Sequence, residues 1–454
     1  SRPRNERLSI AVATLLAGLH PERIETPGGG LSFALMGETP WLGDACSLVE
    51  EFRAGRRSPV EEMKATLAAV RASNLNAISY IDEDGALARA ARADVSKPFG
   101  GVPLGVKELD HVEGWPATEA SVPLADRVSG WTSTMVDRLT NVAGANHFGL
   151  TTSSEFGGVN ITRTVLNGVT RNPWNTAHTP GGSSGGTGAA VAGGLFTLGT
   201  GGDGGGSIRI PAGFNGLVGL KSTFGRIPRG PHVEYGNLTV TTGGLTRSVR
   251  DTARWFDACN GHHSGDPLSL QRVDGWEVGL GTVPVKGLRV AIVPDWGGAV
   301  VSPAMWDVLL ESADFLVAHA GMRRIDGVDT SLPRMGAAWS ISGMIEIAAL
   351  LGDKWPACAD DLTPEMRAGL RVTEGRYGAA ERAKIEARRA QLNVRMHEIF
   401  EQVDIVITAS NPDIAFTAEG PLPDTFGGIV AGAGNNGLLT FPCNLHGNPG
   451  ISVP

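Results

Sequence analysis

Apolar and polar residues in the first third of the chain alternate between helical and strand-like periods. Residues 58–73, "SPVEEMKATLAAVRAS", open with Ser58 as a candidate N-cap and Pro59 in the first turn, which predicts a helix. The same region predicts three further elements: a strand over residues 76–82, a strand over 99–110 and a helix over 133–144. Alternation of this kind is typical of a sheet with mostly parallel strands.

The second half of the chain continues this pattern. It predicts a helix over residues 248–261 and buried strands over 287–295 and 403–410. Ser302 and Pro303 open another helix, and five of its apolar residues predict core positions: Met305, Val308, Leu309, Phe315 and Leu316. Residues 333–402 look largely helical and more charged, which favours a cap or insertion over the sheet.

These patterns predict an α/β fold with a mostly parallel β-sheet and a helical cap. We expect residues 1–43 to form an N-terminal extension with a helix, and residues 44–454 to form a single domain with its core over 70–300. The first residues have the charge and apolar run of a signal peptide, but no small-residue cleavage site follows. An amphipathic helix packed on the body is the preferred interpretation.

Composition narrows the functional classes. The formal net charge is −8, and no basic stripe suits a nucleic-acid backbone. No run of about 18 apolar residues predicts a membrane span. The four cysteines lie far apart, without a C-x-x-C pair or a His-rich neighbourhood, so we expect neither a disulfide framework nor a metal site. We therefore predict a cytoplasmic protein that binds neither nucleic acid nor membrane.

The segment "TPGGSSGGTGAA" contains G-x-S-x-G with Ser183 at its centre, a string that introduces the nucleophile of many serine hydrolases. In α/β-hydrolases an apolar strand leads directly into that serine, whereas here "RNPWNTAHTP" precedes it. Six histidines follow Ser183, none of them in a distinctive setting. A Ser-His-Asp esterase that uses Ser183 is thus kept only as an alternative.

A second string, "GTGGDG" over residues 199–204, matches the G-x-G-x-x-G pattern of dinucleotide-binding loops. Such a loop should open an amphipathic helix whose N-terminus faces pyrophosphate. The next residues, "SIRIPAGFNG", contain Pro211 and two glycines, so they do not predict that helix. Nucleotide binding is accordingly disfavoured.

The Gly-rich segment as a whole offers a third interpretation. Gly accounts for 63 of 454 residues, and 16 of these fall between Gly181 and Gly219. Ser207 follows three successive glycines there, and such a run lets N–H groups crowd around one point, as an oxyanion hole requires. This segment resembles the amidase signature family, whose members hydrolyse amide-type C–N bonds with a Ser, cis-Ser, Lys triad.

The resemblance extends from about residue 44 to the end. "GGVPLGVKELD" is similar to the family's lysine motif, "TTSSEFGG" and "TRNPWN" to its flanking blocks, and "GNPGISVP" to its late strand. It implies the amidase-signature fold, which has a large central mixed, mostly parallel β-sheet with helices on both faces and a helical cap. It also implies a catalytic segment over 181–223. Family members normally continue past the point where this sequence ends, so we expect a truncated C-terminal end.

Carried over residue by residue, the resemblance implies that Ser207 is the nucleophile, Ser183 the bridging serine with a cis peptide, and Lys107 the base. The implied oxyanion hole consists of the backbone amides of Gly204, Gly205, Gly206 and Ser207. The implied supporting residues are Ser184, Asp203 and Arg209. The resemblance implies no metal and no organic cofactor.

The proposed role of Lys107 as a base requires a lowered pKa, and this requirement follows from acid–base chemistry without reference to the family. A lysine accepts a proton from a serine only when the lysine is neutral, and an exposed lysine has a pKa near 10.4. Lowering the pKa to about 7.5 takes roughly 4 kcal/mol of desolvation or like-charge influence. We therefore expect Lys107 to be buried, with the neighbouring Glu108 pointing the other way from the strand.

Two positions depart from the family pattern: Gly204 stands where Thr is usual, and Glu108 where Asp is usual. Some members of the family are amidotransferase subunits, which commonly carry Gln after the Arg of the nucleophile motif. Here that position is Ile210, which favours a free-standing hydrolase over a subunit that acts with partner subunits. A binding protein with a dead site is disfavoured because all three triad positions are filled.

The substrate is the least determined feature. The resemblance indicates a small-molecule amide or carbamate as substrate, and it leaves aliphatic amides, anilides, carbamates and oligoamides open. It is also compatible with a homodimer. Candidate pocket residues are Thr152, Ser153, Phe156, Trp174 and Cys443, together with the wider region 333–443.

Overall fold

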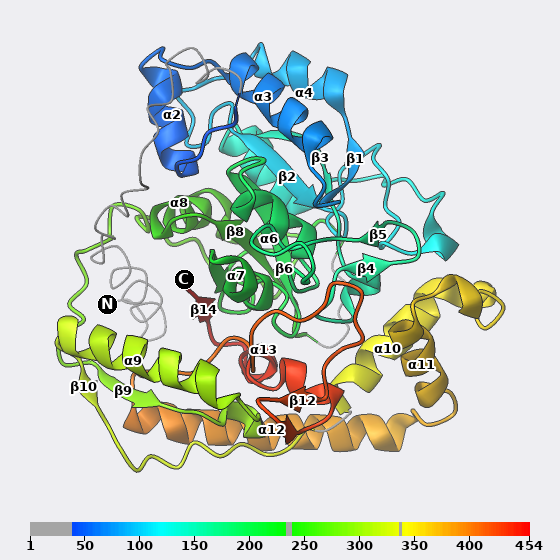
Figure 1. Ribbon diagram of the computed structural model, residues 1–454, viewed down its shortest axis with the longest axis vertical. Helices are drawn as coiled ribbons and strands as arrows, with labels where there is room; N and C mark the ends of the chain where they lie inside the picture. The colour runs from blue at the N-terminus through cyan, green and yellow to red at the C-terminus, as the bar shows by residue number, and fades with distance from the viewer. Residues whose placement is uncertain (1–38, 233–237, 336–337) are drawn as a thin grey trace.

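The computed structural model describes residues 39–232, 238–335 and 338–454, and its largest element is a seven-stranded sheet (Figure 1). The strand order is β1-β3-β2-β6-β8-β7-β14. The strands are β1 (Ile78–Ile81), β2 (Pro103–Lys107), β3 (Asn146–Thr151), β6 (Leu198–Asp203), β7 (Val218–Lys221), β8 (Thr241–Thr246) and β14 (Gly450–Ser452). The predicted α/β class and mixed sheet are confirmed.

The sheet is not mostly parallel, however. Within the described residues, β2 pairs in parallel with β3 and β6, whereas the other four neighbouring pairs are antiparallel. β6 and β7 run in the same direction, as a strand–helix–strand pattern predicts, but β8 is inserted between them and runs against both. Helix and strand alternation gives the direction of successive strands, but it does not show which later strand enters between them.

Helices cover both faces of this sheet because side chains on a strand alternate between faces. On β2, Leu104 and Val106 belong to a core shared with α2 (Ala45–Arg53) and α8 (Val249–Cys259). Gly105 faces the opposite side, where a Cβ atom would lie 2.5 Å from the ring of Phe196. That second core is shared by α3 (Pro59–Ala72), α4 (Glu83–Ala90), α6 (Gly185–Ala192) and α7 (Arg209–Asn215).

Predicted helix and strand boundaries agree closely with these elements. α3 begins after Ser58, which accepts a hydrogen bond from the Glu61 amide in a capping box. The predicted helix at 133–144 is present as α5 (Thr134–Asp137) followed by a π-helical turn over Arg138–Val142.

Two short hairpins lie outside the large sheet. In one, β4 (Arg163–Thr164) pairs with β5 (Gly168–Val169), and in the other, β12 (Thr425–Phe426) pairs with β13 (Ile429–Val430).

A smaller three-stranded parallel sheet lies at the bottom of Figure 1. It has the order β10-β9-β11, and the strands are β9 (Arg289–Ile292), β10 (Arg323–Arg324) and β11 (Ile405–Ile407). α9 (Pro303–His319) and α12 (Ala379–Gln402) flank it. The predicted core positions Val308 and Phe315 on α9 are wrong, since both are exposed while Ala313 and Val317 are buried. Apolar residues occur on several sides of α9, so periodicity selected too wide a face.

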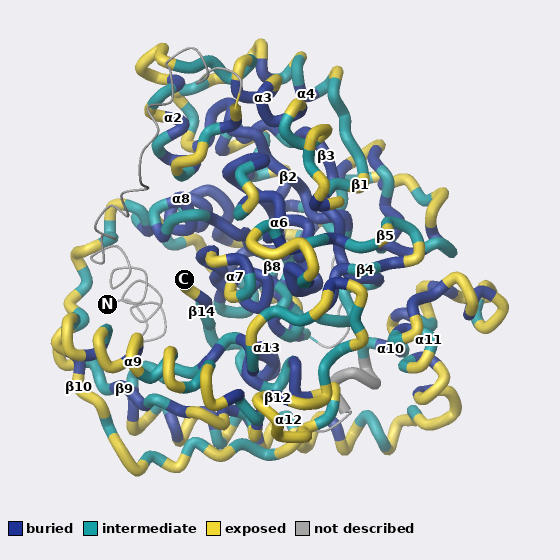
Figure 2. The backbone as a smooth tube through the Cα atoms, viewed as in Figure 1, coloured by how far each residue is buried: buried dark blue, intermediate teal, exposed yellow. Residues whose placement is uncertain are grey.

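The segment over 333–402 contains α10 (Ala338–Leu351), α11 (Pro364–Thr373) and α12. α10 and α11 share a small apolar core that also includes Phe156 and Val159 from the main body. Figure 2 shows buried residues concentrated around β2, β6 and β8, with exposed residues along α9 and α12. The role of this segment as a cap stays a prediction. The predicted N-terminal helix lies outside the described residues.

None of the helices described here is both long enough and apolar enough to cross a membrane. In the described part of the chain no group of three or more His, Cys, Asp and Glu side chains is placed to hold a metal ion. The four cysteines are free thiols.

Candidate active site

Lys107 lies at the carboxyl end of β2, and its side chain is buried. Its Nζ donates a hydrogen bond to Ser183 Oγ at 2.7 Å. The Lys107 backbone N–H donates to Thr200 Oγ1 at 2.7 Å, and that hydroxyl donates to Asp110 Oδ2 at 2.6 Å. The neighbouring strand β6 thus fixes the end of β2, and Lys107 points from there into the Gly-rich segment.

Burial lowers the pKa of Lys107 to about 8, although nearby carboxylates, chiefly Asp110 and Asp203, act in the opposite direction. The ammonium form loses hydration in this position, and the carboxylates recover only part of that loss. A sizeable fraction of Lys107 is therefore neutral near pH 8. The predicted burial of this lysine is confirmed.

Glu108 points away from Lys107 Nζ and Ser183. Its Oε1 accepts the Ser153 N–H at 2.5 Å, and its Oε2 accepts Asn167 Nδ2 at 2.8 Å. Burial raises the pKa of Glu108 to about 7, and these hydrogen bonds to the carboxylate limit the rise. The predicted orientation of Glu108 is confirmed, and its carboxylate joins β2 to the segment after β3.

Ser183 lies in the turn that leads into α6, and the Gly182–Ser183 peptide is cis, as the resemblance implies. The Ser183 side chain is buried, and its carbonyl accepts the Ser154 N–H at 3.2 Å. Gly157 lies against it, because a Cβ atom on Gly157 would be 3.4 Å from Ser183 Oγ. Ser183 is thus enclosed by two glycine-containing turns, with Lys107 as the partner of its hydroxyl.

Ser207 is half-buried at the end of the 204–207 loop, between β6 and α7. Its carbonyl accepts the Ser184 N–H at 3.3 Å, which ties this loop to the turn that carries Ser183. Ser184 Oγ lies 3.4 Å from Gly202 O. Among the described residues the structure records no hydrogen bond between the Ser183 and Ser207 hydroxyls. The two serines belong to joined backbone segments, but their side chains are not bonded.

Asp203 and Arg209 form a buried ion pair that encloses the 204–207 loop. Arg209 Nη2 and Nε lie 2.9 and 3.0 Å from the two Asp203 oxygens. Burial by itself raises the pKa of Asp203, but the charge and hydrogen bonds of Arg209 outweigh burial and hold that pKa well below its usual range. Both charges are compensated inside the protein, so the pair fixes the two ends of the loop.

The predicted oxyanion hole needs one correction. The Gly206 N–H donates to Asp203 Oδ1 at 2.8 Å, so this amide is engaged inside the protein and the prediction that includes it is wrong. Among the described residues none accepts a hydrogen bond from the amides of Gly204, Gly205 or Ser207. These three amides remain as donors for a substrate oxygen, and their role stays a prediction.

Several site residues were missed by sequence reasoning. Asp110 lies three residues after Lys107, and its contact with Thr200 follows only from the pairing of β2 with β6. Thr440 and Asn444 come from α13 (Phe441–His446) and its N-cap, and they bond to the 204–207 loop and to Asp203. More than 200 residues separate them from the loop, so no local pattern indicates their contact.

The predicted pocket residues do not lie together. Thr152 and Ser153 are fully buried, with Thr152 Oγ1 bonded to Thr170 Oγ1 and Ser153 Oγ donating to Ser154 O, so neither offers a free group to a substrate. Trp174 is 71% exposed and donates to Asn215 O. These three predictions receive no support from the geometry.

The two remaining pocket predictions differ from each other. Phe156 has φ +52° and packs against the α10–α11 core, one residue before the Gly157 that touches Ser183. Cys443 is half-buried, and Asn448 Nδ2 lies 3.7 Å from its Sγ. Phe156 therefore lies beside the Lys107–Ser183 pair, whereas Cys443 lies on α13.

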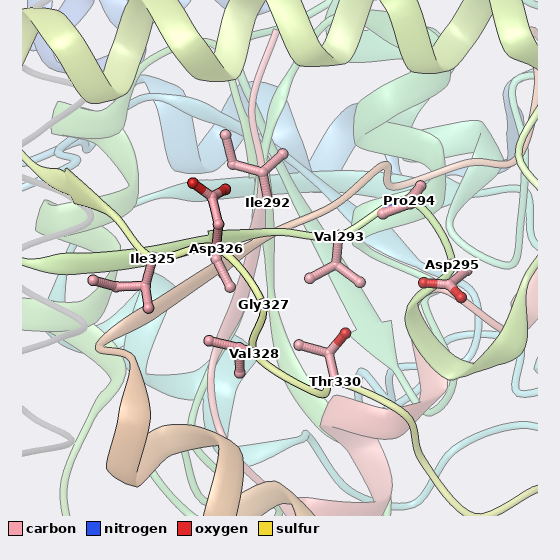
Figure 3. A pocket seen from close by; sticks show the side chains of 10 residues that line it. Ile292, Val293, Pro294, Asp295, Ile325, Asp326, Gly327, Val328 and Thr330 are labelled. Carbon is pink, nitrogen blue, oxygen red and sulfur yellow. The ribbon is translucent and has the colours of Figure 1, made fainter.

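A surface hollow of about 240 Å³ lies at the ends of the small parallel sheet (Figure 3). It is lined by Ala291, Ile292, Val293, Pro294, Asp295, Ile325, Asp326, Gly327, Val328 and Thr330. None of the predicted site residues is among them. The hollow is therefore separate from the Lys107–Ser183 pair.

Neither alternative motif has the structural setting it requires. No strand among the described residues leads directly into Ser183, and the partner of its hydroxyl is a lysine rather than a histidine. The G-x-G-x-x-G string over 199–204 lies almost entirely on β6 instead of forming a loop at a helix start. Both motif matches are coincidental.

Comparison with known proteins agrees with this geometry. A family model described as "Amidase" matches residues 60–454. A glutamyl-tRNA(Gln) amidotransferase subunit of Lactiplantibacillus plantarum is 30% identical, with 90% of this chain and 89% of that protein covered.

Solved structures show the same architecture. A bacterial aryl acylamidase of the amidase signature enzymes superposes with a TM-score of 0.81 at 24% identity, covering 91% of this chain and 89% of that one. The 6-aminohexanoate cyclic dimer hydrolase complexed with substrate gives a TM-score of 0.78 at 25% identity, with coverage of 91% and 90%. These similarities confirm the predicted fold.

Proposed function

Because this chain belongs to the amidase family, we propose that it hydrolyses amide-type C–N bonds of small molecules through Ser207, Ser183 and Lys107. The family limits its chemistry to C–N hydrolysis or amidotransfer. The observation that carries the proposal is the 2.7 Å hydrogen bond between Lys107 Nζ and Ser183 Oγ, inside the protein and at a lysine whose pKa is lowered to about 8.

In the proposed reaction, Ser207 Oγ attacks the substrate carbonyl carbon as its proton passes to Ser183 and the Ser183 proton passes to neutral Lys107. The relay requires the two serine hydroxyls to come within hydrogen-bond distance when substrate binds. Active-site hydrogen bonds commonly tighten only in the substrate complex. Free amides in the 204–207 loop then stabilise the oxyanion of the tetrahedral intermediate.

Collapse of that intermediate breaks the C–N bond. The proton held by Lys107 returns through Ser183 to the leaving nitrogen, which departs as an amine, and an ester to Ser207 remains. Water attacks this acyl-enzyme with the same relay accepting its proton, and the carboxylic acid leaves. Every proton is returned, so the relay ends as it began.

A second candidate is the glutaminase step of an amidotransferase subunit that works with partner subunits, because the relative from Lactiplantibacillus plantarum has that name. The residue after Arg209 speaks against it. Ile210 is an apolar side chain that is almost fully buried, where family transferase subunits commonly carry Gln. We therefore propose a free-standing hydrolase, and with it the cytoplasmic location predicted from the cysteines.

The test is a hydrolysis screen of the purified chain over aliphatic amides, anilides, carbamates, oligoamides and glutamine, with the Ser207→Ala variant as blank. We expect turnover of at least one non-glutamine amide by the chain alone, and its loss in Ser207→Ala with the circular dichroism spectrum unchanged. Hydrolysis of glutamine alone would favour the transferase function. Turnover in Ser207→Ala at the wild-type rate would refute the assignment of the nucleophile.

A further inference from the structure

One peptide unit of the 204–207 loop is bound at both of its polar atoms. The carbonyl of Gly205 accepts a hydrogen bond from Thr440 Oγ1 at 2.5 Å, and the N–H of Gly206 donates to Asp203 Oδ1 at 2.8 Å. A trans peptide is planar, and its C=O and N–H point in opposite directions. Thr440 and Asp203 therefore fix the plane of the Gly205–Gly206 peptide from its two sides.

Close packing at Gly206 shows how near Thr440 comes to this peptide. Gly206 has φ +137°, a backbone conformation that residues other than glycine rarely adopt. A Cβ atom there would lie 2.4 Å from Thr440 Oγ1 and 2.7 Å from Ile210 Cδ1. The loop thus fits directly against Thr440, without room for a side chain at Gly206.

Thr440 is itself held in place. It is the N-cap of α13 and is almost fully buried, and its carbonyl accepts Arg209 Nη1 at 2.8 Å. Its hydroxyl also lies 3.2 Å from Gly437 O. One turn further on, Asn444 Oδ1 accepts Arg209 Nη2 at 2.6 Å and its Nδ2 donates to Asp203 O at 2.8 Å. The start of α13 therefore binds both the loop and the ion pair that encloses it.

We infer that Thr440 is a positioning residue for the oxyanion hole: its hydroxyl turns the Gly205–Gly206 peptide away from the substrate, so that the neighbouring amides of Gly205 and Ser207 present their N–H groups to the oxyanion. This inference rests on the proposed hydrolase function. By this inference Thr440 does more than stabilise the fold. It lowers the free energy of the transition state, in which negative charge develops on the substrate oxygen.

The test compares Thr440→Val, which removes the hydroxyl at nearly constant volume, with Thr440→Ser, which keeps it. The matched control is Thr246→Val on β8, because Thr246 is also buried and donates its hydroxyl to a backbone carbonyl, that of Ser248. Steady-state kinetics are measured on the amide that the wild type hydrolyses fastest, with Ser207→Ala as blank and thermal unfolding of each variant alongside.

For Thr440→Val we expect kcat to fall by roughly ten- to a hundred-fold while KM changes by less than about twofold, because an interaction made only in the transition state is lost. Thr440→Ser should stay near the wild-type kcat, as should Thr246→Val.

Unchanged kcat in Thr440→Val would overturn the inference and leave the hydrolase function standing. A loss in Thr440→Ser as large as in Thr440→Val would also overturn it. If the valine variant fails to fold, a loss of kcat by about ten-fold or more in folded Thr440→Ser would overturn the inference by itself. No difference between wild type and Ser207→Ala would refute the proposed function, and the inference with it.

Discussion

Lys107 becomes partly neutral through burial, in spite of the carboxylates around it. Asp110, Asp203, Glu108 and Glu119 all act to raise its pKa, yet loss of hydration dominates and the pKa falls to about 8. A lysine surrounded by water would stay protonated and could not accept a proton from Ser183. The hydrogen bond places Lys107 Nζ 2.7 Å from Ser183 Oγ, so a neutral amine lies within reach of the proton that this hydroxyl releases.

This environment predicts the pH dependence of the proposed reaction. The neutral form of Lys107 is the active form, so kcat/KM should rise as pH increases through about 8 and then level off. The measurement is kcat/KM for one amide between pH 6 and about 10. A profile that is flat or falls across this range would contradict a neutral lysine base.

Lys221 provides the control for that profile, because burial also lowers the pKa of this lysine to about 8. Its Nζ donates to Ser222 O at 2.9 Å instead of to a catalytic hydroxyl. In Lys221→Met the inflection should therefore stay where it is in the wild type. Disappearance of the inflection in Lys221→Met would show that Lys221, and not Lys107, produces it.

The three candidate catalytic residues were accessible from the sequence because each lies within a short motif. The geometry adds what a motif does not contain: Ser183 is bonded to Lys107, whereas its hydroxyl is not bonded to Ser207. The resemblance implied that the Gly206 amide belongs to the oxyanion hole, whereas in the structure this amide donates to Asp203 Oδ1. Its acceptor, Asp203, is only three residues away, so spacing alone did not exclude it.

At the scale of elements, the α10–α11 pair is fastened to the main body by one buried carboxylate. Glu155 Oε2 accepts both the Thr363 N–H at 2.8 Å and the Thr363 hydroxyl at 2.6 Å, while its Oε1 accepts Ser121 Oγ at 2.7 Å. Thr363 is the N-cap of α11, and Glu155 lies two residues before Gly157, where a Cβ atom would lie 3.4 Å from Ser183 Oγ. The position of α11 is thus coupled to the turn beside the site.

Glu155→Gln tests this attachment. The glutamine NH₂ group cannot accept the hydrogen bonds that one carboxylate oxygen accepts, so we expect unfolding free energy to fall by about 1–3 kcal/mol, the cost of leaving buried donors unsatisfied. Hydrogen exchange in α11 should also become faster. Urea unfolding measures the change in unfolding free energy, and hydrogen-exchange mass spectrometry of the folded protein measures the exchange in α11.

The matched control is Glu365→Gln on α11. Glu365 forms a partly exposed ion pair with Arg163, with side chains 21% and 22% exposed, so its replacement should cost less than about 1 kcal/mol. Equal losses in the two variants, with unchanged exchange in α11, would show that Glu155 does not hold this helix.

Across the whole molecule, the candidate site is assembled from segments that are distant in the chain. β2 supplies Lys107, the turn before α6 supplies Ser183, and the loop after β6 supplies Ser207. α13 then closes over that loop from the far end of the sequence, as the placement of α13 beside α7 and β14 in Figure 1 illustrates. The site therefore depends on the packing of the main body as a unit.

This arrangement also explains the limits of prediction from sequence. Helix and strand periods gave the α/β class and most boundaries, since those depend on neighbours in the chain. The insertion of β8 between β6 and β7 and the contact between Thr440 and Gly205 depend on tertiary pairing, which no local period encodes. Thr152 and Ser153 stay predictions as pocket residues, because the sequence did not show that their hydroxyls bond to Thr170 and to the Ser154 carbonyl.

The most direct test of the account is the identity of the serine that becomes covalently modified. The intact protein is treated with a fluorophosphonate, which reacts with activated serine nucleophiles, and the adduct is located by mass spectrometry after chymotryptic cleavage at Phe196, which separates Ser183 from Ser207. We expect one adduct, on the peptide with Ser207, and none in Ser207→Ala. An adduct on Ser183, or labelling of Ser207→Ala at the wild-type rate, would contradict it.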